Sequence, residues 1–110
     1  MTTAPLPTPA ARAILKLGHD LSLARRRRHI SQASMAERIG ASLATVRRIE
    51  KGDPRIPLHF IARALHLFGE VERLSGILDS SDDAIGLALT DEQLPKRVRA
   101  RRIDPGAGAL

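Results

Sequence analysis

The chain has 110 residues, 43% of them hydrophobic, and carries a formal net charge of +6 at pH 7. This length is sufficient for one domain, and the absence of cysteine excludes disulfide bonds, thiol nucleophiles and thiolate metal sites. Since the sequence has no Trp or Tyr and only two Phe, we expect an aliphatic core, which suits a small helical bundle.

The first segment, residues 1–12, is predicted to be a flexible arm because it contains three prolines and no charge before Arg12. It lacks the basic-then-apolar order of a secretion signal, and no apolar run in the sequence approaches the length that spans a bilayer. We therefore expect a cytoplasmic protein. A first helix is predicted from about Ala13 to Arg28, with Leu17, Leu21 and Ala24 recurring on one face.

A second helix is predicted to begin after Ser31, whose hydroxyl can cap the helix N-terminus. Gly40 is its predicted end, since glycine readily adopts the left-handed conformation that follows many helices. The residues expected to face inward are Ala33, Ala36 and Ile39.

Ser42 is predicted to cap a third helix that ends at Gly52, with Val46 and Ile49 facing inward. Two short amphipathic helices separated by a tight glycine turn are typical of a helix-turn-helix, which places its second helix in the major groove of DNA.

Pro57 is well placed as the first residue of a fourth helix, which Gly69 closes. The residues expected to face inward are Leu58, Ile61, Ala62, Leu65 and Phe68. A fifth helix is indicated by Val71, Leu74 and Leu78. The sequence thus predicts an all-α domain over residues 13–78, an orthogonal bundle of five helices, followed by a C-terminal extension over residues 79–110 with a basic tail.

The basic charge lies mainly in the predicted helix-turn-helix half. Residues 12–51 contain ten Lys or Arg and three Asp or Glu, whereas residues 52–94 contain three and eight. This asymmetry favours one surface for a polyanion and another surface for a separate purpose.

The third helix is expected to contact DNA through the side opposite Val46 and Ile49, where Ala44, Arg47, Arg48 and Lys51 fall. Leu43 and Ala44 offer apolar contact to thymine methyl groups, and Arg48, or less favourably Arg47, suits a bidentate contact to guanine. Gln32 can hydrogen-bond a phosphate at the positive end of the second helix. The full set of DNA-contact candidates is Gln32, Ser42, Leu43, Ala44, Thr45, Arg47, Arg48 and Lys51. The alternative is that the cations form a solvated helix face.

Residues 25–28 are four consecutive arginines, which point all round a helix and so cannot share one role. We expect Arg25 to turn inward and pair with Glu50. The other three would be available for phosphates, although a plain surface role fits at least two of the four.

Residues 32–52 resemble the helix-turn-helix family of phage λ repressor and Cro, the Xre family, and the resemblance extends over about residues 14–78. Its marks are Arg25, Ser31, Gln32, Ala36, Gly40, Ser42, Val46, Ile49, Glu50 and Gly52. The resemblance implies a five-helix λ-repressor-like domain, a structural Arg25–Glu50 salt bridge, and DNA contacts from the positions of Gln32, Leu43, Ala44 and Arg48. Many members carry Gln, Arg or Asn where this chain has Leu43 and Ala44, so base discrimination there should be modest.

Residues 79–102 resemble the C-terminal extension of HipB-like antitoxins, which are encoded beside HipA-type serine/threonine kinase toxins. This resemblance implies a homodimer that binds an inverted-repeat operator in double-stranded DNA, represses its own operon and binds the kinase. A stand-alone regulator without a toxin partner is the alternative. Leu74, Ile77 and Leu78 are candidates for the dimer contact; if all three belong to the core, the dimer forms elsewhere. The basic segment 96–102 fits a solvated tail, an arm that follows DNA phosphates, or a segment that orders against the kinase.

The sequence does not favour catalysis, a metal or a cofactor. His19, His29, His59 and His66 lack metal-ligand spacing, and no glycine-rich phosphate loop or Gly-x-Ser-x-Gly motif occurs. RNA binding is also disfavoured, because it usually requires aromatic side chains on which bases stack.

Overall fold

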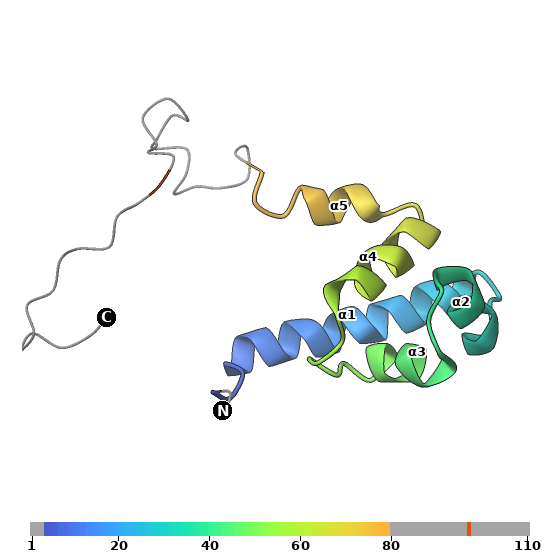
Figure 1. Cartoon of the computed structure of the whole chain (residues 1–110), viewed down its shortest axis with the longest axis horizontal. Helices are drawn as coiled ribbons and strands as arrows, with labels where there is room; N and C mark the ends of the chain where they lie inside the picture. The colour runs from blue at the N-terminus through green and yellow to red at the C-terminus, as the bar shows by residue number, and fades with distance from the viewer. Residues whose placement is uncertain (1–3, 80–96, 98–110) are drawn as a thin grey trace, which may run out of the picture. The chain divides into compact units, whose positions relative to one another are not determined.

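The computed structural model of the chain describes residues 4–79 and Arg97, so the C-terminal extension lies outside the described residues except for Asp79 and Arg97. In the described part, five helices follow one another without any strand (Figure 1): α1 Thr8–Arg27, α2 Gln32–Ile39, α3 Leu43–Glu50, α4 Leu58–Leu67 and α5 Val71–Ser75. The predicted all-α fold is confirmed. The chain divides between Ile77 and Leu78, and these helices belong to the first unit. None of them is both long and apolar enough to cross a lipid bilayer.

The first helix, α1, begins at Thr8 rather than near Ala13, so the predicted flexible arm is wrong for residues 8–12. The physical reason is that Pro9 lies in the first turn of α1, where the missing N–H group would have no intrahelical partner. Alanines favour continuation of the helix, and Ala10 and Ala11 follow directly.

The turn between α2 and α3 is built from two serine caps and one glycine. The Ser31 hydroxyl accepts a hydrogen bond from the Ser34 N–H at 3.0 Å, and the Ser42 hydroxyl accepts one from the Thr45 N–H at the same distance. Gly40 has φ 68°, and the next amide, that of Ala41, donates to the Ala36 carbonyl at 2.9 Å. This pattern is a Schellman motif, which ends α2 and redirects the chain into α3.

The helices pack in a chain of contacts, in which α3 packs on α1 and α2 while α4 packs on α2 and α5. The core draws its buried residues from α1 to α4 and the residue that ends α4, and α5 supplies none. The buried apolar residues of the core are Leu21, Met35, Ala36, Ile39, Val46, Ile49, Ala64 and Phe68.

In α2, the predicted inward residue Ala33 is exposed and Met35 is buried instead. The buried stripe of α2 is centred between Met35, Ala36 and Ile39, and Ala33 lies about 115° away from that centre around the helix.

A groove of about 840 Å³ runs between α1, α4 and α5. Its lining includes Ile14, Leu17, Leu58, Ile61, Leu74 and Ile77. Leu17 and Leu58 were expected to face inward but are 37% and 66% exposed, because they face this open groove rather than the core. Leu78 was also expected on the inner side of the fifth helix, but that helix ends at Ser75 and Leu78 is 82% exposed.

Gly18 allows α1 and α3 to approach closely. A Cβ atom at this buried position would strike the carbonyl oxygen of Ile49, and it would lie 3.0 Å from the amide nitrogen of Gly52. The backbone at the end of α3 therefore rests directly on α1, which fixes the position of α3 in the bundle.

We expect Gly18→Ala to lower the free energy of unfolding by about 1–3 kcal/mol through overpacking. This sign opposes helix propensity, which favours Ala over Gly by about 1 kcal/mol inside a helix. Urea denaturation of the full chain measures the effect. Gly76→Ala is the matched control, since Gly76 has φ −92° and a Cβ there makes only ordinary contacts. A Gly18→Ala protein as stable as the wild type would contradict the close packing.

Candidate nucleic-acid interface

The outer face of α3 combines one small residue with three cations. Val46 and Ile49 are buried on the inner side, whereas Ala44, Arg47, Arg48 and Lys51 are exposed. Around the helix, Ala44 and Lys51 lie near the centre of the exposed face, with Arg47 and Arg48 about 50° to either side. Small residues allow close approach to a groove, and the flanking cations suit phosphates or guanine edges.

The first turn of α3 holds the remaining DNA-contact candidates on that helix. Leu43 and Thr45 are half-buried and Ser42 is exposed. The Ser42 hydroxyl, which caps the helix, also donates to Thr45 Oγ1 at 2.9 Å. The hydroxyls of Ser42 and Thr45 therefore contact each other.

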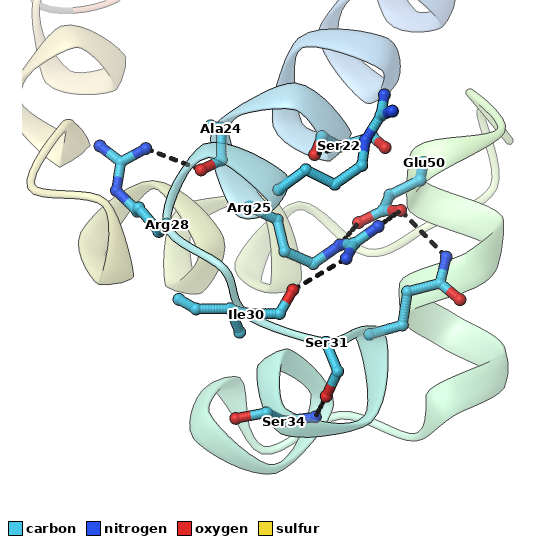
Figure 2. Close-up of polar contacts among 10 residues, drawn as sticks. Ser22, Ala24, Arg25, Arg28, Ile30, Ser31, Ser34 and Glu50 are labelled. Atoms are coloured by element: carbon cyan, nitrogen blue, oxygen red, sulfur yellow. Dashed lines mark hydrogen bonds and ion pairs between the residues drawn. The ribbon is translucent and has the colours of Figure 1, made fainter.

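Arg25 and Glu50 form the predicted ion pair, which joins α1 to the end of α3 (Figure 2). Arg25 Nε donates to Glu50 Oε2 at 2.7 Å and Nη2 donates to Oε1 at 3.0 Å. The two side chains are only 11% and 6% exposed. Arg25 Nη1 donates to the Ile30 carbonyl at 2.8 Å, which ties the start of α2 to the same group. A bidentate, nearly buried pair of this kind constrains the angle between the helices it joins.

Gln32 was expected to bind a phosphate, but its amide nitrogen donates to Glu50 Oε1 at 3.0 Å. One of its two N–H groups is thereby used within the protein, and a phosphate contact would have to come from the other. Gln32, the first residue of α2, thus joins this helix to the Arg25–Glu50 pair.

The Glu50 carboxylate is kept ionised by its partners. Burial alone would raise the pKa of this carboxyl, but the hydrogen bonds from Arg25 and Gln32 outweigh burial and hold the pKa below its ordinary value.

A second cluster follows α3, where Asp53 contacts Arg48 and Arg55. Arg48 Nε donates to Asp53 Oδ2 at 2.8 Å, and Arg55 Nε donates to Oδ1 at 3.1 Å. The Asp53 side chain is 12% exposed, against 49% for Arg48 and 80% for Arg55. The hydrogen bonds from Arg55 and Arg48 hold the pKa of Asp53 well below its usual range. Sequence analysis did not identify Asp53 or Arg55, because both lie between the third and fourth predicted helices, outside any helical pattern.

The arginine run at the end of α1 divides into different roles. Arg28 donates to the Ala24 carbonyl at 2.9 Å, and its guanidinium carbon lies 4.7 Å from the centre of the Phe68 ring. It therefore connects the end of α1 to α4. Arg26, Arg27 and Arg28 are all exposed, as a phosphate contact would require.

Residues 16–75 match the model of a protein family described as a helix-turn-helix domain. The match covers more than half of the chain and contains α2, the turn and α3. No curated protein and no solved structure shows a significant match to the chain.

Replacing Glu50 by Ala should lower the free energy of unfolding by about 3–5 kcal/mol at neutral pH, because the Arg25 charge stays buried without its carboxylate. Glu50→Gln keeps the shape of the side chain and should cost less. Urea denaturation at pH 7 measures both losses. A midpoint for Glu50→Ala equal to that of the wild type would contradict a stabilising role for the pair.

The advantage of wild type over Glu50→Gln should also depend on pH. Since the pKa of Glu50 is lowered from a value near 4.5 in the folded state, its contribution is fully present above about pH 4.5. The contribution is lost as the pH falls through the folded-state pKa, so the difference in unfolding free energy between the two proteins should shrink in acid. A constant difference from pH 7 to pH 3 would contradict this assignment.

Proposed function

The chain belongs to the helix-turn-helix domain family, and from this we propose that it is a sequence-specific DNA-binding repressor that acts as a homodimer. In this proposal α3 enters the major groove of double-stranded DNA. A cytoplasmic location follows as part of the proposal, because the partner is the genome.

The observation that carries this proposal is the exposed face of α3. Arg47, Arg48 and Lys51 are all exposed on a helix whose other side is fixed by the buried Val46 and Ile49. No ion pair involves Arg47 or Lys51 within the described residues, so their charges are available to a polyanion. A solvated helix face accounts for the charges but not for their combination with a helix-turn-helix.

The groove between α1, α4 and α5 supports the homodimer. Ile77 is 65% exposed on the groove, and Leu58 is 66% exposed on the same surface. Of the sequence-derived dimer candidates, only Leu74 is half-buried, while Ile77 and Leu78 are exposed. The groove lining also includes acidic and basic residues, among them Asp20 and Arg73, which suits a self-complementary two-fold contact. A two-fold dimer would place its two α3 helices in successive major grooves about 34 Å apart, on an inverted repeat.

The finer proposal is that this repressor is the antitoxin of a HipA-type kinase and controls its own operon. Its support is the sequence of residues 79–102, which lies outside the described residues except for Asp79 and Arg97. A stand-alone regulator would share the same helical domain and lack only the kinase partner.

Selection of duplexes by the full-length protein from a random-sequence pool should yield an inverted repeat with half-sites one helical turn apart. With the selected duplex, Arg48→Ala should lose about 1–3 kcal/mol of discrimination at one base pair in each half-site, measured by fluorescence anisotropy. Arg47→Ala should act mainly through phosphates and weaken binding to all sequences. Arg12→Ala is the matched control, because it removes an equal charge from an exposed position of α1 that lies away from α3 and from the groove. If Arg48→Ala weakens binding to selected and scrambled duplexes equally, Arg48 is a phosphate contact.

Co-expression of the tagged chain with its neighbouring genes tests the antitoxin proposal. We expect stoichiometric recovery of a kinase, identified by mass spectrometry, which a chain truncated after Ile77 should fail to recover. Recovery of the homodimer alone, still able to bind its own promoter, would favour the stand-alone regulator.

A further inference from the structure

We propose that Asp53 is a positioning residue for base recognition, which holds the Nε edge of Arg48 so that Nη1 and Nη2 are presented end-on to a guanine. This inference rests on the proposed function, since it requires that α3 lies in the major groove. It assigns a role in specificity to a carboxylate, a group that would otherwise repel DNA.

Asp53 is itself held in place by the backbone on both sides. Its N–H donates to the Arg48 carbonyl at 3.0 Å, which fixes Asp53 to the last turn of α3. Its Oδ1 accepts from the Arg55 N–H at 2.9 Å, which fixes the carboxylate orientation. The carboxylate is therefore a rigid acceptor and not a mobile surface charge.

The contact with Arg48 selects one edge of the guanidinium. Nε is bound to Asp53 Oδ2 at 2.8 Å, so the side-on edge that contains Nε is occupied. The end-on pair, Nη1 and Nη2, keeps its outward N–H groups, and these match the O6 and N7 acceptors of guanine. The Arg48 side chain is 49% exposed, which leaves this end accessible.

Holding Arg48 before DNA binds reduces the entropy that binding would otherwise cost. A free arginine loses much rotamer freedom when it forms a bidentate contact, and a side chain already ordered in the bound geometry loses less. The carboxylate does not cancel the attraction for DNA, because Arg48 and Arg55 together carry two positive charges against one negative charge.

Replacing Asp53 should have two separate effects, one on the affinity for all duplexes and one on the preference for a single base pair. Removing a negative charge near the phosphates should strengthen binding to any duplex. Loss of positioning should instead lower the preference for the base pair that Arg48 contacts. The two effects can be separated because one acts on all sequences and the other on one base pair.

The experiment uses the full-length protein, the duplex it selects from a random pool, that duplex with the Arg48-contacted pair changed, and a scrambled duplex. We expect Asp53→Ala to bind the scrambled duplex at least as tightly as wild type, and to lose about 3- to 10-fold in preference at the contacted pair. This loss is smaller than the roughly 5- to 150-fold expected for Arg48→Ala, which removes the donors themselves. Asp53→Ala combined with Arg48→Ala should lose no more preference than Arg48→Ala alone, since Asp53 acts through Arg48.

Glu37→Ala is the matched control, because Glu37 is an exposed carboxylate on α2. It should change affinity for all duplexes alike and leave the base preference intact. Asp53→Asn provides a second variant if Asp53→Ala does not fold, since its side-chain oxygen still accepts from the Arg55 N–H. It should lose part of the preference, because a neutral amide holds a guanidinium less firmly.

The inference is overturned if Asp53→Ala keeps the full preference, or if its loss adds independently to that of Arg48→Ala. A higher preference in Asp53→Ala would also overturn it, because Asp53 would then be masking Arg48. The proposed function is unaffected by these outcomes if the wild-type protein selects a sequence and Arg48→Ala lowers the preference for the contacted base pair. Failure of the wild-type protein to select any duplex would instead overturn both proposals.

Discussion

The buried ion pair between Arg25 and Glu50 is the constraint on which the arrangement of the helices depends. Two hydrogen bonds join Arg25 of α1 to Glu50 of α3, and the same two side chains also bind the Ile30 carbonyl and the Gln32 amide. Taking both charges out of water is costly and is offset only when every donor and acceptor is satisfied. Among the described residues, no buried side-chain nitrogen or oxygen lacks a partner. The pair therefore tolerates one relative placement of α1, α2 and α3, and that placement sets the direction in which α3 presents its exposed face.

Much of this could be predicted from the sequence because its causes are local. Ser31 and Ser42 cap the helices that follow them, and Gly40 ends α2 in a left-handed conformation, each within a few residues. Predictions were wrong where a local pattern permitted two answers. The apolar stripe of α2 could include Ala33 or Met35, and the decision comes from packing against other helices. The prolines near the N-terminus indicated a flexible arm, yet Pro9 in a first helical turn is compatible with a helix.

The candidate site was predictable in its position but not in its hydrogen bonding. The sequence indicates which face of α3 is exposed, because Val46 and Ile49 define the buried side by their spacing. It does not indicate that Gln32 donates to Glu50, a contact between residues that are far apart along the chain. Asp53 was missed for a related reason, since its carboxylate reaches Arg48 only after the turn that follows α3 brings it back.

The two acidic residues at the end of α3 use arginine in opposite ways. Glu50 neutralises Arg25 inside the protein, so that arginine supports the fold and is withdrawn from DNA. Asp53 lies beneath Arg48 and Arg55, whose guanidinium groups remain outside with a net positive charge. The role of each of these arginines thus depends on the side chain that its guanidinium group contacts. Arg28 is a further example, because its guanidinium group packs on the Phe68 ring. Within the described part of the chain, a count of basic residues consequently overstates the charge open to a polyanion, because Arg25 is withdrawn into its pair with Glu50. Arg47 and Lys51 on the exposed face of α3 keep their charges outside any ion pair among those residues.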